Sequence, residues 1–521
     1  MKQRIANCPA CGAPIEFQLS TALVTVCGFC HSVVARTDKK LEDLGKVADL
    51  FETNSPVKKG MTGTFEKKSF DVVGRVQYQH PAGGVWDEFY LKFPGDRVRW
   101  LAYAQGKFYL TTEKRLTDTS QIPDFETMTP GYRLNLPDGN TLVVAESGTA
   151  TARSADGDIP WAFHPNAAHR FVDLHGADSE FATLEYDADG PHLFLGREIA
   201  VDDLKLTGDS WQFEQPPSAN VGVLQLSCPQ CGSPLTLHAP DETLRVCCPS
   251  CKSLLDCQQG KLEYLQTLTM KQGEKPLIPL GAVGHLNGVE VTVIGYLVRY
   301  VVYDGKKFSW SEYLLHNPKI GFRWLVLNGG HWSFVEAIPV SSVVEQTNSV
   351  VYEGETFKLF DRGTAFVQYV AGEFYWRVTI EEQVASTDFI APPRMISYEA
   401  SANDTGSELN ISLGTYLPKE AVEVAFGVKD LPTPWGVGAI QPAPPPPKDV
   451  YIMWGVFVVI LIWLNVMFLS KLVTTPVNQF HFYVALVILS IWPLLTMLGR
   501  RQFEVERWKQ SDFNPYQGSD E

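Results

Sequence analysis

Four cysteine pairs, each of the form Cys-x-x-Cys, constrain this chain more than any other feature. Two pairs lie in the first 40 residues, where fifteen residues separate Cys11 from Cys27. The other two lie near the middle, where sixteen residues separate Cys231 from Cys248. Two such knuckles at this spacing are typical of a small module in which four thiolates hold one tetrahedral ion. The sequence therefore predicts two zinc ribbons.

Eight of the ten cysteines are the predicted zinc ligands. The first site uses Cys8, Cys11, Cys27 and Cys30, and the second uses Cys228, Cys231, Cys248 and Cys251. Four thiolates leave no open coordination position, so both zinc ions are expected to be structural. Cys247 and Cys257 are surplus, and we prefer Cys248 to Cys247 because it opens the second knuckle as Cys27 does in the first copy.

The cysteine module begins a larger repeat. Several spacings are the same in both halves, and thirty residues lead from the last ribbon cysteine to the first glycine in each. The matching positions are Gly60, Gly63 and Gly74 with Gly281, Gly284 and Gly295, Trp86 with Trp310, Trp100-Leu101 with Trp324-Leu325, Gly106 with Gly330, and Gly148-Thr-Ala150 with Gly363-Thr-Ala365. The chain is therefore two ribbon-plus-β units in tandem.

The fold class is predicted to be mainly β, because short runs of β-branched and aromatic residues alternate with Gly, Asp, Asn and Pro turns. We expect two all-β domains, each a barrel or a sandwich, and a C-terminal helical transmembrane hairpin. The predicted order is zinc ribbon 1 at 1–40, a short helix or linker at 41–57, a β domain at 58–217, zinc ribbon 2 at 222–258, a linker at 259–275, a second β domain at 276–436, a proline-rich spacer at 437–449, transmembrane helices at 450–470 and 479–498, and a cytoplasmic tail at 499–521, of which 502–521 is expected to be disordered.

The hairpin is inferred from two uncharged stretches near the C-terminus. They contain 21 and 20 residues, and each is long enough to cross a hydrocarbon core of ~30 Å. The connection between them is short, so both ends of the chain should lie on one side. Arg500, Arg501, Arg507 and Lys509 follow the second stretch, which predicts that this side, with both ribbons, is the cytoplasm.

Charge and motifs disfavour several function classes. A net charge of −15 repels phosphate backbones, so no nucleic-acid partner is expected. No phosphate-binding loop or nucleophile–base pair is found, and no second carboxylate is seen to recur in register, so we do not expect an enzyme. Glu88 and Glu312, each two residues after a tryptophan, carry the alternative: an acid or base, or a group that grips a cation.

The motif Trp-x-Glu-(Phe/Tyr)-x-Leu, followed by Trp-Leu fourteen residues after its first Trp and then Gly-x-(Phe/Trp), resembles a bacterial family known only as domain of unknown function 4178. The resemblance covers roughly 58–215 and 276–436. It implies a bacterial origin, an all-β module and a link to envelope-stress or toxic-stress genes. It brings no catalytic residues with it.

These observations predict a membrane-anchored binding or scaffold protein of the bacterial inner membrane. It would hold a protein partner on the cytoplasmic side, in envelope stress, toxic stress or defence. One alternative is a redox- or zinc-responsive sensor that uses Cys247 or Cys257. The other is an uncharacterised enzyme that uses the Trp-x-Glu motifs. The sequence leaves the oligomeric state open.

Overall fold

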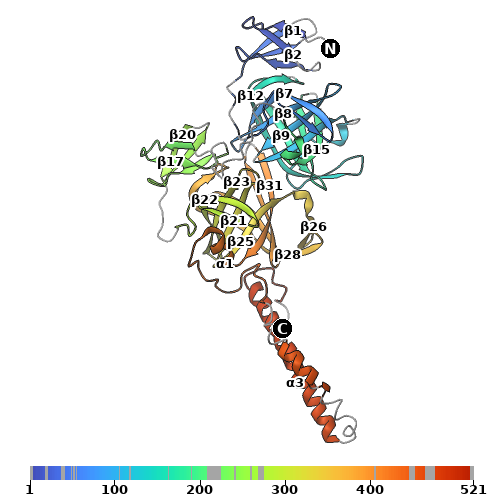
Figure 1. The fold of residues 1–521 in the computed structure, drawn as a ribbon, viewed down its shortest axis with the longest axis vertical. Coiled ribbons are helices and arrows are strands. Elements are labelled where there is room, and N and C mark those ends of the chain that lie inside the picture. The colour runs from blue at the N-terminus through green and yellow to red at the C-terminus, as the bar shows by residue number, and fades with distance from the viewer. Residues whose placement is uncertain are drawn as a thin grey trace.

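In the computed structural model most described elements are strands, which confirms the mainly β fold class (Figure 1). The described residues are 4–17, 22–36, 41–47, 50, 53, 55–104, 106–116, 119–161, 163–188, 190–207, 224–239, 242–258, 261–267, 275–403, 406–444, 452–460, 462–463 and 476–516.

The first β domain is a closed, eight-stranded antiparallel barrel, here called barrel 1. In the order in which they pair, its strands are β7 (Lys68–Gln79), β8 (Val85–Phe93), β9 (Arg97–Ala104), β10 (Lys107–Lys114), β15 (Gly190–Ile199), β14 (Glu180–Asp187), β13 (Ala168–His175) and β12 (Thr141–Ile159), and β12 pairs again with β7. The short strands β6 (Thr62–Phe65) and β11 (Arg133–Asn135) pair with β7 and β12.

The second β domain, barrel 2, closes in the same strand order. Its strands are β22 (Val289–Tyr303), β23 (Lys306–Asn317), β24 (Gly321–Asn328), β25 (His331–Ile338), β31 (Gly406–Leu417), β30 (Arg394–Asn403), β29 (Gln383–Ala391) and β28 (Glu355–Phe374), and β28 pairs with β22. Short strands β21 (Val283–Leu286), β26 (Val344–Gln346) and β27 (Ser349–Tyr352) flank them. The predicted tandem repeat is thus confirmed.

Paired glycines bend the long strands at one equivalent place in each barrel. Gly74 pairs with Gly157, and Gly295 pairs with Gly372. The second glycine of each pair has positive φ, 76° and 84°. A Cβ at Gly74 would lie 2.1 Å from the carbonyl oxygen of Asp158, so only glycine lets the two strands come this close.

Each cysteine module is a small β structure attached to the end of its own barrel. Module 1 contains β1 (Arg4–Asn7), β2 (Pro14–Phe17), β3 (Val24–Val26), β4 (Ser32–Arg36) and β5 (Leu41–Lys46); module 2 contains β16 (Leu224–Ser227), β17 (Pro234–Leu237), β18 (Arg245–Cys247), β19 (Ser253–Gln258) and β20 (Lys261–Thr267). Strand β3 pairs with the end of β12, and β18 pairs with the end of β28.

Two of these strands correct the predicted boundaries. The segment 41–57 begins with strand β5 instead of a short helix, and the linker 259–275 contains strand β20. Strand β5 pairs with β4 of the β3–β4 hairpin, and β20 pairs with β19 of the β18–β19 hairpin. Each hairpin gains a third strand because β4 and β19 have a free edge for backbone hydrogen bonds. The apolar spacing of Leu41 and Leu44 fits a strand with a bulge: the two side chains pack into different clusters.

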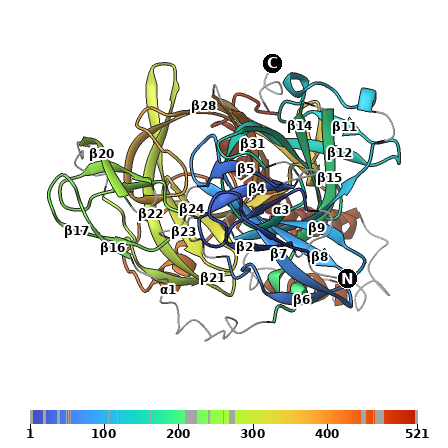
Figure 2. The same cartoon turned by 90° about the horizontal axis from the view of Figure 1, so that it is seen from above.

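The two barrels are joined through strand pairing. The start of β31 pairs with β12, where Ser147 lies opposite Ser407 and their hydroxyls are 3.1 Å apart. Figure 1 shows barrel 1 above barrel 2, and Figure 2 shows the same arrangement from above. Helix α1 (Lys419–Phe426) packs Val422 and Phe426 into the core of barrel 2.

A helical stalk extends from barrel 2 (Figure 1). It contains α3 (Pro476–Trp508), and residues 452–460 and 462–463 are also helical. The predicted hairpin connection, 471–478, is described only from Pro476 onward. Within the described residues, no helix combines the length and the apolar character that crossing a membrane requires.

The C-terminal tail differs from the prediction for 499–521. Helix α3 continues to Trp508, so the first residues of the tail that was expected to be disordered are helical. Trp508 packs against Phe360 of barrel 2, with ring centroids 5.4 Å apart. In the sequence, the charged residues after 499 suggest a solvated tail. Arg507 is nevertheless fully buried, and a buried guanidinium needs hydrogen-bond acceptors. The carbonyl groups of 438–441, where the chain leaves barrel 2, provide them.

Candidate functional site

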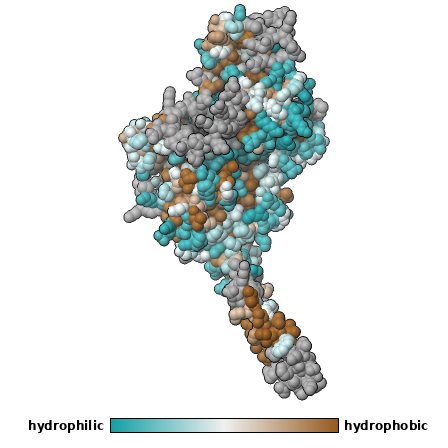
Figure 3. Space-filling model, in the orientation of Figure 1, coloured by the Kyte–Doolittle hydropathy of each residue, from teal (hydrophilic) through white to brown (hydrophobic). Residues whose placement is uncertain are grey.

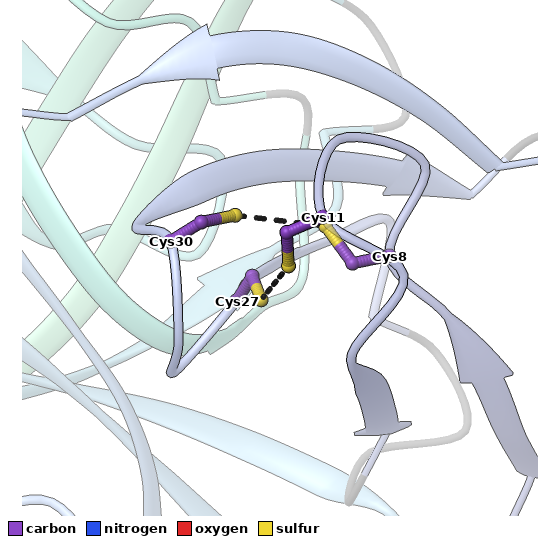
Figure 4. A group of neighbouring side chains, drawn as sticks. All are labelled: Cys8, Cys11, Cys27 and Cys30. Carbon is purple, nitrogen blue, oxygen red and sulfur yellow. Dashed lines mark hydrogen bonds between the residues drawn. The ribbon is translucent and has the colours of Figure 1, made fainter.

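The four predicted cysteines of module 1 meet at one point (Figure 4). Their Sγ atoms all lie within 4.8 Å of one another, and the pairs Cys8–Cys30 and Cys11–Cys27 are 3.7 Å apart. Each Cys-x-x-Cys motif forms a tight turn that closes with a backbone hydrogen bond, from Gly12 to the carbonyl of Cys8 in one and from His31 to the carbonyl of Cys27 in the other. This group could hold a metal ion.

Module 2 repeats this arrangement. Cys228 lies 3.7 Å from Cys251, and Cys231 lies 3.7 Å from Cys248, measured between Sγ atoms. Hydrogen bonds from the side chain and backbone of Ser253 lower the pKa of Cys251 to about 6, which favours the thiolate. This second group could also hold a metal ion.

The surplus cysteines lie outside the second group. Cys247 is 4% exposed and packs among Leu254, Ile294 and Phe374. Burial raises the pKa of Cys247 to about 12, so it is a thiol at neutral pH. Cys257 is also buried. These surroundings suit small apolar side chains and disfavour the exposed thiolate that a redox sensor requires.

An acidic residue holds each cysteine module on its barrel, and our reading of the sequence missed both. The residues are Asp158 and Glu373, each directly after a positive-φ glycine. Asp158 accepts a hydrogen bond of 2.8 Å from the hydroxyl of Thr25 in module 1. Glu373 accepts hydrogen bonds from four groups of module 2: the backbone N–H groups of His238 and Ala239, the His238 ring and the Thr243 hydroxyl.

The Trp-x-Glu motifs face the barrel interiors. In barrel 1 the indole of Trp86 donates to Glu88 at 3.3 Å and its ring contacts Phe171, which lies three strands away around the barrel. In barrel 2 the indole of Trp310 donates to Glu312 at 2.6 Å. Contact across non-neighbouring strands places this side-chain set inside the barrel.

Strand register shows that four interior carboxylates recur in both barrels. The starting point is Gly148 and Gly363, which follow identical bulges in β12 and β28. The equivalent pairs are Glu88 and Glu312, Glu146 and Asp361, Asp173 and Asp388, and Glu185 and Glu399. This corrects the expectation that no second carboxylate recurs.

A sequence signal for one of these pairs was present. Asp173 follows Gly148 by 25 residues, and Asp388 follows Gly363 by the same 25. Each accepts a hydrogen bond from a hydroxyl on the next strand, Thr183 or Ser397. Glu185 and Glu399 could not be matched by spacing, because they follow their aspartates by twelve and eleven residues.

Burial favours the neutral, protonated form of these carboxyl groups. It raises the pKa of Glu88, Asp173 and Asp388 to about 7 each. It raises the pKa of Glu185 well above the ordinary value, with a further contribution from the charge of Glu88 across the barrel.

Barrel 2 carries a cation of its own among these acids. The Arg299 side chain is 8% exposed, with its Nε 3.3 Å from Glu312 and one Nη 3.2 Å from Glu399. One guanidinium therefore bridges the cross-barrel pair of glutamates.

Comparison with known proteins assigns the two barrels to one family. The model of the family described as "Domain of unknown function (DUF4178)" matches residues 58–201 and 279–419. The chain belongs to this family. Both DUF4178 segments coincide with barrels, and both cysteine modules lie outside them.

The other comparisons add no functional information to the DUF4178 assignment. No curated protein matches the chain. A solved structure, the crystal structure of MucB in complex with MucA(peri), is 10% identical, covering 70% of this chain and 95% of that one, with a TM-score of 0.10. A score this low supports no conclusion about fold or function.

Proposed function

We propose that this chain is a membrane-tethered binding protein whose two DUF4178 barrels, each stabilised by a zinc ribbon, are held on the cytoplasmic side of a bacterial inner membrane. There the barrels hold a protein partner during envelope or toxic stress. The main support for membrane attachment is the position of Arg507 at the end of α3.

Arg507 ties the end of α3 to the segment by which the chain leaves barrel 2. Its guanidinium donates to the carbonyl oxygens of Gly438, Ala439 and Gln441 at 2.7–3.1 Å. The chain between Gln441 and Arg507 therefore leaves barrel 2 and returns to it. An out-and-back path is what a helical hairpin in a membrane requires, and it supports placing both chain ends on the side of the barrels.

The surface of this excursion is apolar, as the brown stalk in Figure 3 shows. Its exposed side chains include Ile452 at 65%, Val459 at 65%, Val487 at 62% and Met497 at 71%. An exposed apolar surface of this extent on a helix costs free energy in water, and a lipid environment removes that cost.

Zinc is the metal that best fits the cysteine groups. A tetrahedral ion with Zn–S bonds of ~2.3 Å separates its sulfur ligands by about 3.8 Å. The sulfur pairs in both modules are 3.7 Å apart. With four thiolates each, both sites would stabilise the fold without binding substrate.

Membrane attachment is tested by washing membranes from cells that express the full chain. Under alkaline carbonate, which strips peripheral proteins, we expect the chain to stay in the pellet. In spheroplasts, added protease should spare tags at both the N- and the C-terminus. Release into the supernatant contradicts the tether, and cleavage of either tag contradicts the cytoplasmic orientation.

A further inference from the structure

The interior of barrel 1 contains two acids, Glu88 and Glu185, that have no cation between them in the described part of the chain. Glu88 on β8 and Glu185 on β14 lie on opposite walls of the barrel, and the charge of Glu88 raises the pKa of Glu185. Among the described residues, no lysine or arginine forms an ion pair with either glutamate. His169 lies 3.7 Å from Glu185, but burial lowers its pKa to about 4, so it is neutral at pH 7.

Barrel 2 shows what the same pair of acids binds. Glu312 and Glu399 are the equivalents of Glu88 and Glu185, and the guanidinium of Arg299 bridges them. In barrel 1 the strand position of Arg299 is held by Tyr78, which lies opposite Trp86 as Arg299 lies opposite Trp310. Barrel 1 thus keeps the two acids and lacks the cation.

The walls around the acids of barrel 1 suit an organic cation. Tyr78 stacks on Trp86 with ring centroids 5.1 Å apart, and Phe171 lies 5.4 Å from Trp86. Aromatic faces attract ammonium and guanidinium groups, and they do so most strongly where water is excluded.

A metal ion fits this place less well. Among the described residues, the only groups of three or more potential ligands within 4.8 Å of one another are the two cysteine sets. The described carboxylates of barrel 1 therefore form no such set, whereas a planar guanidinium bridges two carboxylates in barrel 2.

We propose that barrel 1 binds a small organic cation, with a guanidinium or ammonium head held between Glu88 and Glu185 beside the Tyr78–Trp86 stack. The bound head group takes the role that Arg299 plays in barrel 2. This binding activity is additional to the protein partner and the membrane attachment proposed above and depends on neither, so either proposal can fail alone.

The test is ligand-observed saturation-transfer NMR on the full chain in detergent, with methylguanidinium as the probe at constant ionic strength. We expect saturable binding by the wild type and at least a tenfold weaker affinity in Glu88→Gln and in Glu185→Gln. Glu312→Gln, the matched change in barrel 2, should bind like the wild type. Absence of saturable binding, equal loss in Glu312→Gln, or displacement of the probe by Mg²⁺ at matched ionic strength overturns the proposal.

A second variant keeps the test decisive if the glutamine variants fold poorly. Tyr78→Arg gives barrel 1 a tethered guanidinium at the position of Arg299. It should abolish methylguanidinium binding and raise the melting temperature, because the cation no longer has to be supplied from solution. A Tyr78→Arg chain that still binds the probe, or that melts below the wild type, contradicts the proposal.

Discussion

Tyr78 of barrel 1 and Arg299 of barrel 2 occupy the same strand position, each directly opposite the tryptophan of a Trp-x-Glu motif. In barrel 2 the guanidinium of Arg299 bridges two of the four acids that both interiors share. In barrel 1 the described residues place no basic side chain between the equivalent two acids, so we expect the two copies of the repeat to differ in what they bind.

Replacing Arg299 by methionine should destabilise barrel 2. The change leaves the buried Glu312 without its cation, a loss of about 3–5 kcal/mol, and also removes the partner of the more exposed Glu399. Arg299 also lowers the pKa of Glu312, so its removal raises that pKa further. A raised carboxyl pKa in the folded state costs stability as pH rises, so the loss should be larger at pH 8 than at pH 5.5.

The measurement is urea unfolding followed by tryptophan fluorescence at both pH values. Arg362→Met is the matched control, because Arg362 is exposed on β28 and forms no ion pair among the described residues. Equal destabilisation by the two variants would show that Arg299 does not neutralise the interior acids.

Gly372→Ala should distort the place where module 2 joins barrel 2. A Cβ at this position would lie 2.2 Å from the carbonyl oxygen of Ile294, and φ is +84°. Gly305→Ala is the control for φ alone, since its φ is +72° and its surroundings are open. We expect a cost of about 1–2 kcal/mol for Gly305→Ala and about 3 kcal/mol or more for Gly372→Ala in chemical denaturation.

The contact between His238 and Glu373 should make the attachment of module 2 depend on pH. Its hydrogen bond, 2.8 Å long, raises the pKa of His238 above the ordinary value. A raised histidine pKa gives stability that is complete below the unfolded-state pKa, about 6.5, and is lost as pH rises through the folded-state pKa.

His238→Gln should therefore lower the urea midpoint more at pH 5.5 than at pH 8.5. The matched control is His285→Gln, because the His285 side chain is 68% exposed. If the midpoint difference for His238→Gln is the same at both pH values, the ion pair does not contribute to the attachment.

Spacing along the sequence was sufficient to predict the repeat and the two cysteine sets. Gly74 and Gly295 recur because backbones touch there, and such contacts require glycine whatever else changes. The cysteine sets were visible because their ligands lie close together in the chain. The strand β5 was missed because the edge that it joins is formed by a different segment, β4.

The interior acids could not be recognised as a set from the sequence. Glu88 and Glu185 lie 97 residues apart in the chain and come to face the same interior only because the barrel closes. In barrel 2 the β29–β30 connection, counted between equivalent paired residues, is one residue shorter than the β13–β14 connection of barrel 1. The spacing between equivalent acids therefore differs, and the match is visible only from the strand register. The buried role of Arg507 was hidden for the same reason: its acceptors lie 66–69 residues earlier in the chain.

The central claim is that the chain is two copies of one unit, each with its own structural zinc and its own barrel. Metal analysis of the purified full chain tests this most directly. We predict about two zinc ions per chain, about one in either Cys11→Ser or Cys231→Ser, and two in Cys247→Ala. A wild type that contains one zinc or none, or a Cys247→Ala chain that loses one, would contradict the account.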